Sequence, residues 1–128
     1  MILTLHTETV IDSAHQLKGY KGICSRVHGH SWLVELWFRG SNQYLDEVGI
    51  LVDFGIVKEL KEVLDHKFLN DVVDVNPTAE NLSVWVYDWL HNRINDENQK
   101  LKQRVEIKVR LYETVVGKKT YCECGDFK

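Results

Sequence analysis

The sequence has no hydrophobic run long enough to cross a membrane. None of its stretches approaches the roughly 20 consecutive apolar residues that a membrane-spanning helix requires. Its start, MILTLHTETV, has neither the basic segment nor the sustained apolar segment of a secretory signal. Low-complexity segments and clear internal repeats are also absent. We therefore expect no membrane partner and a cytoplasmic location.

Paired cysteines and an excess of basic charge are lacking too. The chain has three cysteines, an odd number that fits a reducing compartment better than a disulfide framework. Its formal net charge of −3 argues against a general binder of nucleic acids or membrane surfaces. A local basic pocket remains compatible with this charge, but no nucleic-acid partner is expected.

The composition is that of a globular protein. Apolar residues make up 44% of the chain and charged residues 27%. At 128 residues the chain can bury one core and is too short for two ordinary domains, which predicts a single domain over residues 1–128.

Two alternating segments near the start predict a pair of antiparallel strands. The odd-numbered residues of segment 2–11 share one strand face, which Ser13 and His15 continue. Segment 27–39 alternates more sharply, and KGYKG between the two is typical of a turn. One face of the second strand holds His28, His30, Trp32, Val34, Leu36 and Phe38.

Two helical patterns follow. Asp53 opens the first, whose apolar positions are Phe54, Val57, Leu60 and Leu64. The stretch DHKFLNDVVDVNPT interrupts it, and Asn76-Pro77-Thr78 is a helix-start signal. The second helix, which NDENQ ends, has an apolar stripe of Leu82, Trp85, Val86, Trp89, Leu90 and Ile94.

Residues 104–116 return to strand alternation, and GKK predicts a hairpin turn into TYCEC. The expected order is β-β-α-α-β-β, an α+β domain with two helices packed on one face of an antiparallel sheet. Such a sheet has open edges, which favour pairing between subunits.

The stretch CSRVHGH, residues 24–30, carries the clearest metal signal. The period of a strand places His28 and His30 on the same face, and His15 reaches that face from the paired strand. Three imidazoles suit zinc with an open coordination position. The alternative is two unrelated histidines at a strand end, but two polar rings on an apolar face need partners.

Cys24 leaves two possibilities open. Its thiolate is a possible fourth ligand that would close a structural zinc site. Alternatively, it lies beside an open site as a base or nucleophile, favoured by the metal and by Arg26.

Asp65, His66 and Glu113 are further candidates. Asp65 and His66 can pair where a helix ends, and an oriented imidazole can move protons near pH 7. The alternative is a solvated histidine. Glu113 has the parity of an apolar strand face, so its carboxylate either grips a ligand with two parallel N–H donors or lies beyond the strand in solvent. Cys122 and Cys124 are expected to be plain strand residues.

Together these pieces resemble the 6-pyruvoyl-tetrahydropterin synthase superfamily over nearly the whole chain. The matching segments are SAH at 13–15, C-x3-HGH at 24–30, LVDF at 51–54, LDHKFLND at 64–71, NPTAEN at 76–81 and YET at 112–114. One departure is Ile11-Asp12-Ser13-Ala14-His15, where the family pattern is F-x-A-A-H.

The resemblance implies the tunnelling fold (T-fold), in which subunits join their sheets into a barrel, commonly as a dimer of trimers. It implies three zinc ligands, His15, His28 and His30. It also implies a general base, Cys24, which disfavours the closed four-ligand site. The remaining implied roles are a proton relay from Asp65 and His66, a pterin anchor and relay partner in Glu113, and a pterin contact at Thr78.

The short spacing of C-x3-HGH resembles the 6-carboxy-tetrahydropterin synthases of queuosine biosynthesis. These zinc lyases convert 7,8-dihydroneopterin triphosphate to 6-carboxy-5,6,7,8-tetrahydropterin, releasing acetaldehyde and triphosphate. Arg26, Lys118 and Lys119 are candidates for binding phosphate. Alternatives on the same fold are a 6-pyruvoyl-tetrahydropterin synthase and a dihydroneopterin aldolase. A structural zinc protein and a non-catalytic pterin-binding protein are rivals of other classes.

Overall fold

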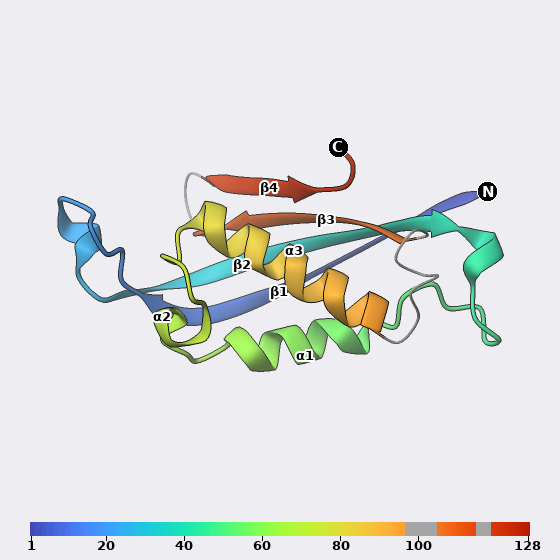
Figure 1. Cartoon of the computed structure of the whole chain (residues 1–128), viewed down its shortest axis with the longest axis horizontal. Coiled ribbons are helices and arrows are strands. Elements are labelled where there is room, and N and C mark those ends of the chain that lie inside the picture. Colours follow the sequence, from blue (N-terminus) through green and yellow to red (C-terminus); the bar gives the residue numbers. More distant parts are fainter. Residues whose placement is uncertain (97–104, 115–118) are drawn as a thin grey trace.

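Four strands form one antiparallel sheet in the order β1-β2-β3-β4 (Figure 1). The structure, a computed structural model, describes residues 1–96, 105–114 and 119–128. The strands are β1 (Ile2–His15), β2 (His28–Ser41), β3 (Val105–Tyr112) and β4 (Tyr121–Gly125).

The two long strands β1 and β2 pair without interruption. Their register runs from Ile2 opposite Ser41 to His15 opposite His28. The alternation of apolar and polar residues specifies this register, because a slip by one residue would turn every buried side chain to the other face. The predicted first strand pair is therefore confirmed, and it brings the end of β1 beside the start of β2.

Two main helices, α1 (Gly55–Leu64) and α3 (Ala79–Asp96), lie on one face of this sheet (Figure 1). Helix α1 packs against β1, and α3 packs against β3 and β4. The carboxylate of Asp53 accepts a hydrogen bond from the N–H of Gly55 at 2.9 Å, which helps to begin α1 as predicted. The fold is the expected α+β arrangement.

The core lies between the sheet and these helices. Trp32 and Phe38 are its largest fully buried side chains, and Leu60 and Leu90 meet them from the helices. Removing this apolar surface from water is the main source of stability, at about 25 cal/mol per Å². Trp85 and Trp89 are half-buried against the same core, as expected.

The structure corrects the predicted elements in several places. Phe54 is 47% exposed, because it precedes the first turn of α1 and does not join the apolar stripe. The predicted helix break contains the short helix α2 (Leu69–Val72). The strand predicted over 104–116 ends at Tyr112. Residues 97–99 of NDENQ and 117–118 of GKK lie outside the described residues.

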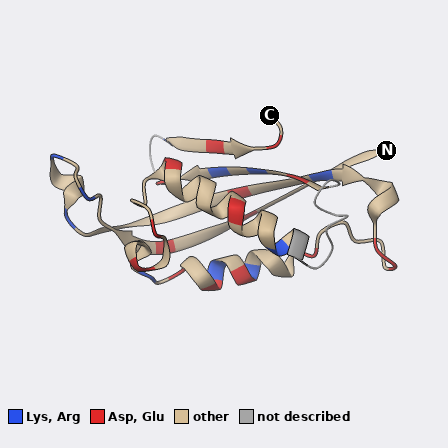
Figure 2. Cartoon of the chain, viewed as in Figure 1, with Lys and Arg blue, Asp and Glu red and all other residues tan. Residues whose placement is uncertain are grey.

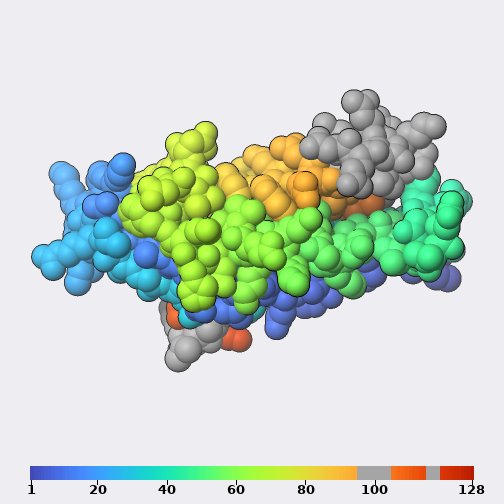
Figure 3. All heavy atoms as spheres, turned by 90° about the horizontal axis from the view of Figure 1, so that it is seen from below, coloured from blue at the N-terminus to red at the C-terminus, as the bar shows by residue number. Residues whose placement is uncertain are grey.

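The molecule is elongated (Figure 3), and the cartoon shows a loop at each end (Figure 1). One loop spans residues 16–27 and contains the short helix η1 (Ile23–Ser25); the other follows β2 and begins with η2 (Asn42–Tyr44). Acidic and basic side chains mix along α1, whereas the loop 16–27 carries only basic ones (Figure 2). Within the described part of the chain, no helix combines the length and apolar character needed to span a membrane.

Candidate functional site

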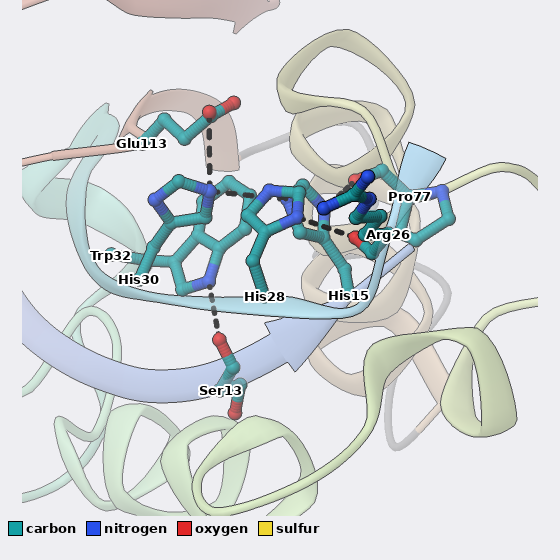
Figure 4. A network of polar contacts seen from close by, with 8 residues as sticks. All are labelled: Ser13, His15, Arg26, His28, His30, Trp32, Pro77 and Glu113. Carbon is teal, nitrogen blue, oxygen red and sulfur yellow. Dashed lines mark hydrogen bonds and ion pairs between the residues drawn. The ribbon is translucent and has the colours of Figure 1, made fainter. Parts of the chain in front are cut away.

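Three imidazoles converge where the first strand pair ends near the loop 16–27 (Figure 4). His15 is the last residue of β1, and His28 and His30 are the first and third residues of β2. The Nε2 atom of His15 lies 2.9 Å from that of His28 and 3.1 Å from that of His30. The strand period and the register thus bring the three predicted ligands together.

Backbone carbonyl groups orient two of these rings. The Nδ1 atom of His15 lies 2.7 Å from the carbonyl oxygen of Pro77, and Nδ1 of His28 lies 2.7 Å from that of Arg26. A carbonyl oxygen only accepts, so each Nδ1 carries the proton and each Nε2 presents a lone pair to the cluster. The sequence did not predict these hydrogen-bond partners, because every residue has a backbone carbonyl group and residue type does not indicate which one bonds a ring.

The cluster fits a metal ion. Four-coordinate zinc binds imidazole nitrogen at about 2.0–2.1 Å, so two such nitrogens are separated by about 3.3 Å. The observed Nε2 separations of 2.9 and 3.1 Å are close to this value. Burial lowers the pKa of His15, and burial also lowers the pKa of His30 even though Glu113 acts to raise it. Lowered pKa values favour the neutral imidazole, the form that binds metals.

Glu113 lies directly beyond β3 and reaches this cluster. Its Oε1 atom is 3.2 Å from Nε2 of His30, and its side chain is 39% exposed (Figure 4). The strand has ended before Glu113, so the carboxylate is not buried in the apolar core. It lies between solvent and the histidines, where a ligand can reach it.

Cys24 lies on η1 and is half-buried. The ligand atoms of the three histidines lie within 4.8 Å of one another, and the Cys24 sulfur does not belong to this group. The described geometry therefore disfavours the closed site in which Cys24 is a fourth ligand.

Asp65 and His66 follow α1 immediately, and their side chains lie close enough for an ion pair if the imidazole is protonated. Oδ2 of Asp65 lies 3.6 Å from Nε2 of His66, whose side chain is 81% exposed. The pair does not hydrogen-bond to the three histidines among the described residues. His66 does line an open pocket of about 460 Å³ together with His30, Gly29 and Lys67, so both candidate groups face one space.

The remaining candidates have structural contacts. The hydroxyl of Thr78 accepts a hydrogen bond from the N–H of Asn81 at 3.1 Å, which caps α3. Cys122 and Cys124 are half-buried on β4, and the hydroxyl of Ser83 lies 3.4 Å from the Cys122 sulfur. Both cysteines are strand residues, as expected.

Two other features lie apart from the cluster. His6, Glu8 and Glu35 form a second group of possible ligands, in which Nε2 of His6 lies 3.0 Å from Glu35. They occupy strand positions of opposite parity to the histidine cluster, and they therefore lie on the other face of the sheet. A larger pocket, about 610 Å³, lies near η2 and the start of α1 and includes no predicted site residue.

Comparison with known proteins identifies the family. Residues 4–124 match the family described as 6-pyruvoyl tetrahydropterin synthase. The chain is 31% identical over 91 residues to a 6-carboxy-5,6,7,8-tetrahydropterin synthase of Synechocystis, covering 65% of this chain and 70% of that protein. It is 36% identical over 93 residues to the enzyme of the same name from Bacillus subtilis, covering 66% of this chain and 62% of the relative.

A solved structure shows the same fold. The 6-pyruvoyl tetrahydropterin synthase of Caenorhabditis elegans superposes with a TM-score of 0.73 at 19% identity, covering 99% of this chain and 97% of the other. The architecture is therefore the predicted T-fold. With the match over residues 4–124, these findings establish that the chain belongs to the 6-pyruvoyl tetrahydropterin synthase family.

Proposed function

We propose that this protein is a 6-carboxy-5,6,7,8-tetrahydropterin synthase acting in queuosine biosynthesis. Its substrate would be 7,8-dihydroneopterin triphosphate, and its products 6-carboxy-5,6,7,8-tetrahydropterin, acetaldehyde and triphosphate. The proposal depends on the convergence of three Nε2 atoms, with those of His28 and His30 lying 2.9 and 3.1 Å from that of His15 and with Glu113 beside them. Relatives named for this activity support the choice of reaction.

His15, His28 and His30 would hold a zinc ion. The Nδ1 atoms of His15 and His28 bond carbonyl groups, which leaves their Nε2 atoms free to bind zinc. Three imidazole ligands would leave one coordination position of the ion for substrate. When bound, zinc supplies Lewis acidity that lowers the pKa of substrate hydroxyl groups.

Cys24 would act as the general base, removing a proton from the substrate side chain. It is half-buried on the loop that leads into His28, and it stands outside the ligand group, which suits a base beside an open site. His66, oriented by Asp65, would carry protons to and from the pterin and its side chain. Family resemblance implies that these groups act across a subunit boundary.

Glu113 would anchor the pterin. Its carboxylate can accept two parallel N–H groups from the 2-amino-pyrimidinone edge, which gives both affinity and orientation. Its position 3.2 Å from His30 would set the bound ring against the metal ligands. Thr78 would add a contact, because a hydroxyl that accepts from Asn81 still has a proton to donate.

Arg26 is the best-placed group for the triphosphate. The loop 16–27 contains three cations and no carboxylate, and the Arg26 carbonyl bonds the ring of His28. Lys119 is exposed beyond the start of β4, while Lys118 lies outside the described residues.

The working unit would be a cytoplasmic homo-oligomer, a dimer of trimers in which each chain forms one domain over residues 1–128. The outer strands of the described sheet are β1 and β4. The turn after α1 covers the end of the β1 edge near Ala14, and the rest of that edge and the edge of β4 are available for pairing with another subunit.

The test is a single reaction. Zinc-loaded protein receives 7,8-dihydroneopterin triphosphate, and mass spectrometry identifies the products. The proposal expects carboxy-tetrahydropterin with acetaldehyde. A pyruvoyl product would instead assign the sister activity, and the name of the Caenorhabditis elegans enzyme makes it the second candidate. Absence of turnover with zinc bound would refute both and favour a structural metal site.

A further inference from the structure

The turn that carries His66 has an unusual backbone conformation. His66 has φ of 54°, and it is the only residue other than glycine with positive φ among the described residues. For a residue with a Cβ atom this left-handed conformation is unfavourable, so neighbouring contacts must hold it. The contacts around this turn therefore hold the backbone from which the His66 side chain extends.

The side chain of Ser13 hydrogen-bonds to the backbone on both sides of this turn. Its hydroxyl donates to the carbonyl of Leu64, the last residue of α1, and accepts from the N–H of Lys67 at 3.3 Å. Ser13 is only 7% exposed, so these backbone groups have little access to water as a substitute partner. One side chain thus joins the residues on either side of Asp65 and His66.

The backbone of β1 supports the same turn. The N–H of His66 donates to the carbonyl of Asp12 at 2.8 Å, and the N–H of Ala14 donates to the carbonyl of Lys67 at 3.0 Å. The N–H of Asp12 donates to Oδ1 of Asp65 at 2.9 Å, which fixes the carboxylate as well. These bonds attach the turn to the edge of β1, and among the described residues Ser13 is the only one of β1 whose side chain is recorded as hydrogen-bonding to it.

The same serine lies next to the candidate metal site. Ser13 precedes His15 by two residues on the same face of β1, and it pairs in register with His30. Its carbonyl oxygen accepts a hydrogen bond from the indole of Trp32 at 3.3 Å (Figure 4). The open pocket of about 460 Å³ is lined by Ser13, His30 and His66 together.

We propose that Ser13 is a positioning residue, which holds the Asp65–His66 pair in place at the edge of β1, from which the pair would act across the subunit boundary. This inference rests on the proposed function for the chemical role of the pair, but the attachment itself does not.

The test compares Ser13→Ala with wild type and with Ser83→Ala. Ser83 is a matched control, because it is fully buried and its hydroxyl donates to the carbonyl of Glu80 at 2.8 Å, within α3. In Ser13→Ala the Lys67 amide should exchange its hydrogen about tenfold faster, because it loses its acceptor. Ser13→Thr, which keeps the hydroxyl, should restore protection.

Turnover supplies the second readout. Ser13→Ala should lower kcat by roughly three- to tenfold while KM and zinc content stay unchanged, and Ser83→Ala should leave kcat at the wild-type value. Unchanged Lys67 exchange would overturn the attachment, and faster exchange with unchanged kcat would overturn the positioning role. If wild-type protein lacks turnover, the proposed reaction fails, while the exchange comparison still decides whether Ser13 holds the pair.

Discussion

The Nδ1 atom of His15 lies 2.7 Å from the carbonyl oxygen of Pro77, the residue before the cap of α3. This contact joins the end of β1 to the start of a helix 62 residues further along the chain. It holds the ring in the tautomer whose Nε2 faces His28, and His15 is fully buried, so the ring has no room to turn away. The site is therefore built from both layers of the fold.

The first prediction concerns the metal ligands. His28→Ala should weaken zinc binding by more than about 100-fold, because it removes one of three imidazoles that the metal requires. Zinc content after dialysis, measured by atomic emission, checks this. His6→Ala is the control, since His6 belongs to the separate group with Glu8 and Glu35 and should leave zinc content unchanged. Full zinc retention in His28→Ala would refute the ligand assignment.

The second prediction concerns Cys24. Cys24→Ala should keep zinc and fold but lower kcat by about 100- to 10,000-fold, the usual contribution of a general base. Cys122→Ala is the control, because that cysteine lies on β4 beside Ser83 and should leave kcat near wild type. Steady-state turnover and zinc content together separate the possible outcomes. Loss of zinc from Cys24→Ala would indicate that Cys24 is a zinc ligand and contradict its role as a base beside an open site.

The third prediction concerns the triphosphate. Arg26→Ala should lower kcat/KM for the triphosphate substrate by about 10- to 100-fold, because a charged hydrogen bond to phosphate is lost. Binding of 7,8-dihydroneopterin, which lacks the triphosphate, should change little. Lys58→Ala, on the exposed face of α1, is the control for general loss of positive charge. An equal loss of affinity for both ligands would place Arg26 away from the phosphates.

The sequence pattern alone predicts that the three histidines lie together, because the period of a strand determines which side chains share a face. His28 and His30 share a face because a strand has period two, and His15 joins them because the alternation sets the register of β1 and β2. Roles for Cys24, Asp65 and Glu113 came from the family resemblance and are proposals still. The spacing of Cys24 from the histidines does not show whether its sulfur binds the metal or acts as a base.

Features of the site that depend on backbone geometry could not be predicted from the sequence. The carbonyl groups of Pro77 and Arg26 orient the ligands, yet any residue has a carbonyl, so no residue type indicates them. The left-handed conformation of His66 depends on contacts with β1 that arise only after folding. Glu113 meets His30 because β3 stops at Tyr112, and strand ends are poorly specified by alternation.

The fourth prediction concerns Gly125, at the end of β4. A Cβ atom at this position would lie 2.3 Å from the carbonyl oxygen of Ile107, and φ is 142°. Gly125→Ala should therefore lower the free energy of unfolding by about 2 kcal/mol or more, through steric overlap added to backbone strain.

Gly49→Ala separates these two causes. Gly49 has φ of 88° with no atom within 4 Å of the added Cβ, so only strain of about 1 kcal/mol is expected. Urea unfolding measures both variants. Equal destabilisation at the two sites would show that the contact with Ile107 has no effect.

The last prediction concerns pH and Glu35. Burial acts to raise the pKa of Glu35, but hydrogen bonds with Tyr112 and His6 outweigh it and lower the pKa below 4.5. A lowered carboxyl pKa stabilises the folded protein above the unfolded value, and that stabilisation disappears as pH falls through the folded value. Glu35→Gln should therefore be less stable than wild type at neutral pH.

This difference between Glu35→Gln and wild type should shrink steadily below about pH 4.5. Urea unfolding at several pH values between neutral and acid measures it. Glu62→Gln, at an exposed position on α1, is the control and should follow wild type throughout. A difference that is constant with pH would mean that the charge of Glu35 does not contribute, and that the variant loses packing or neutral hydrogen bonds instead.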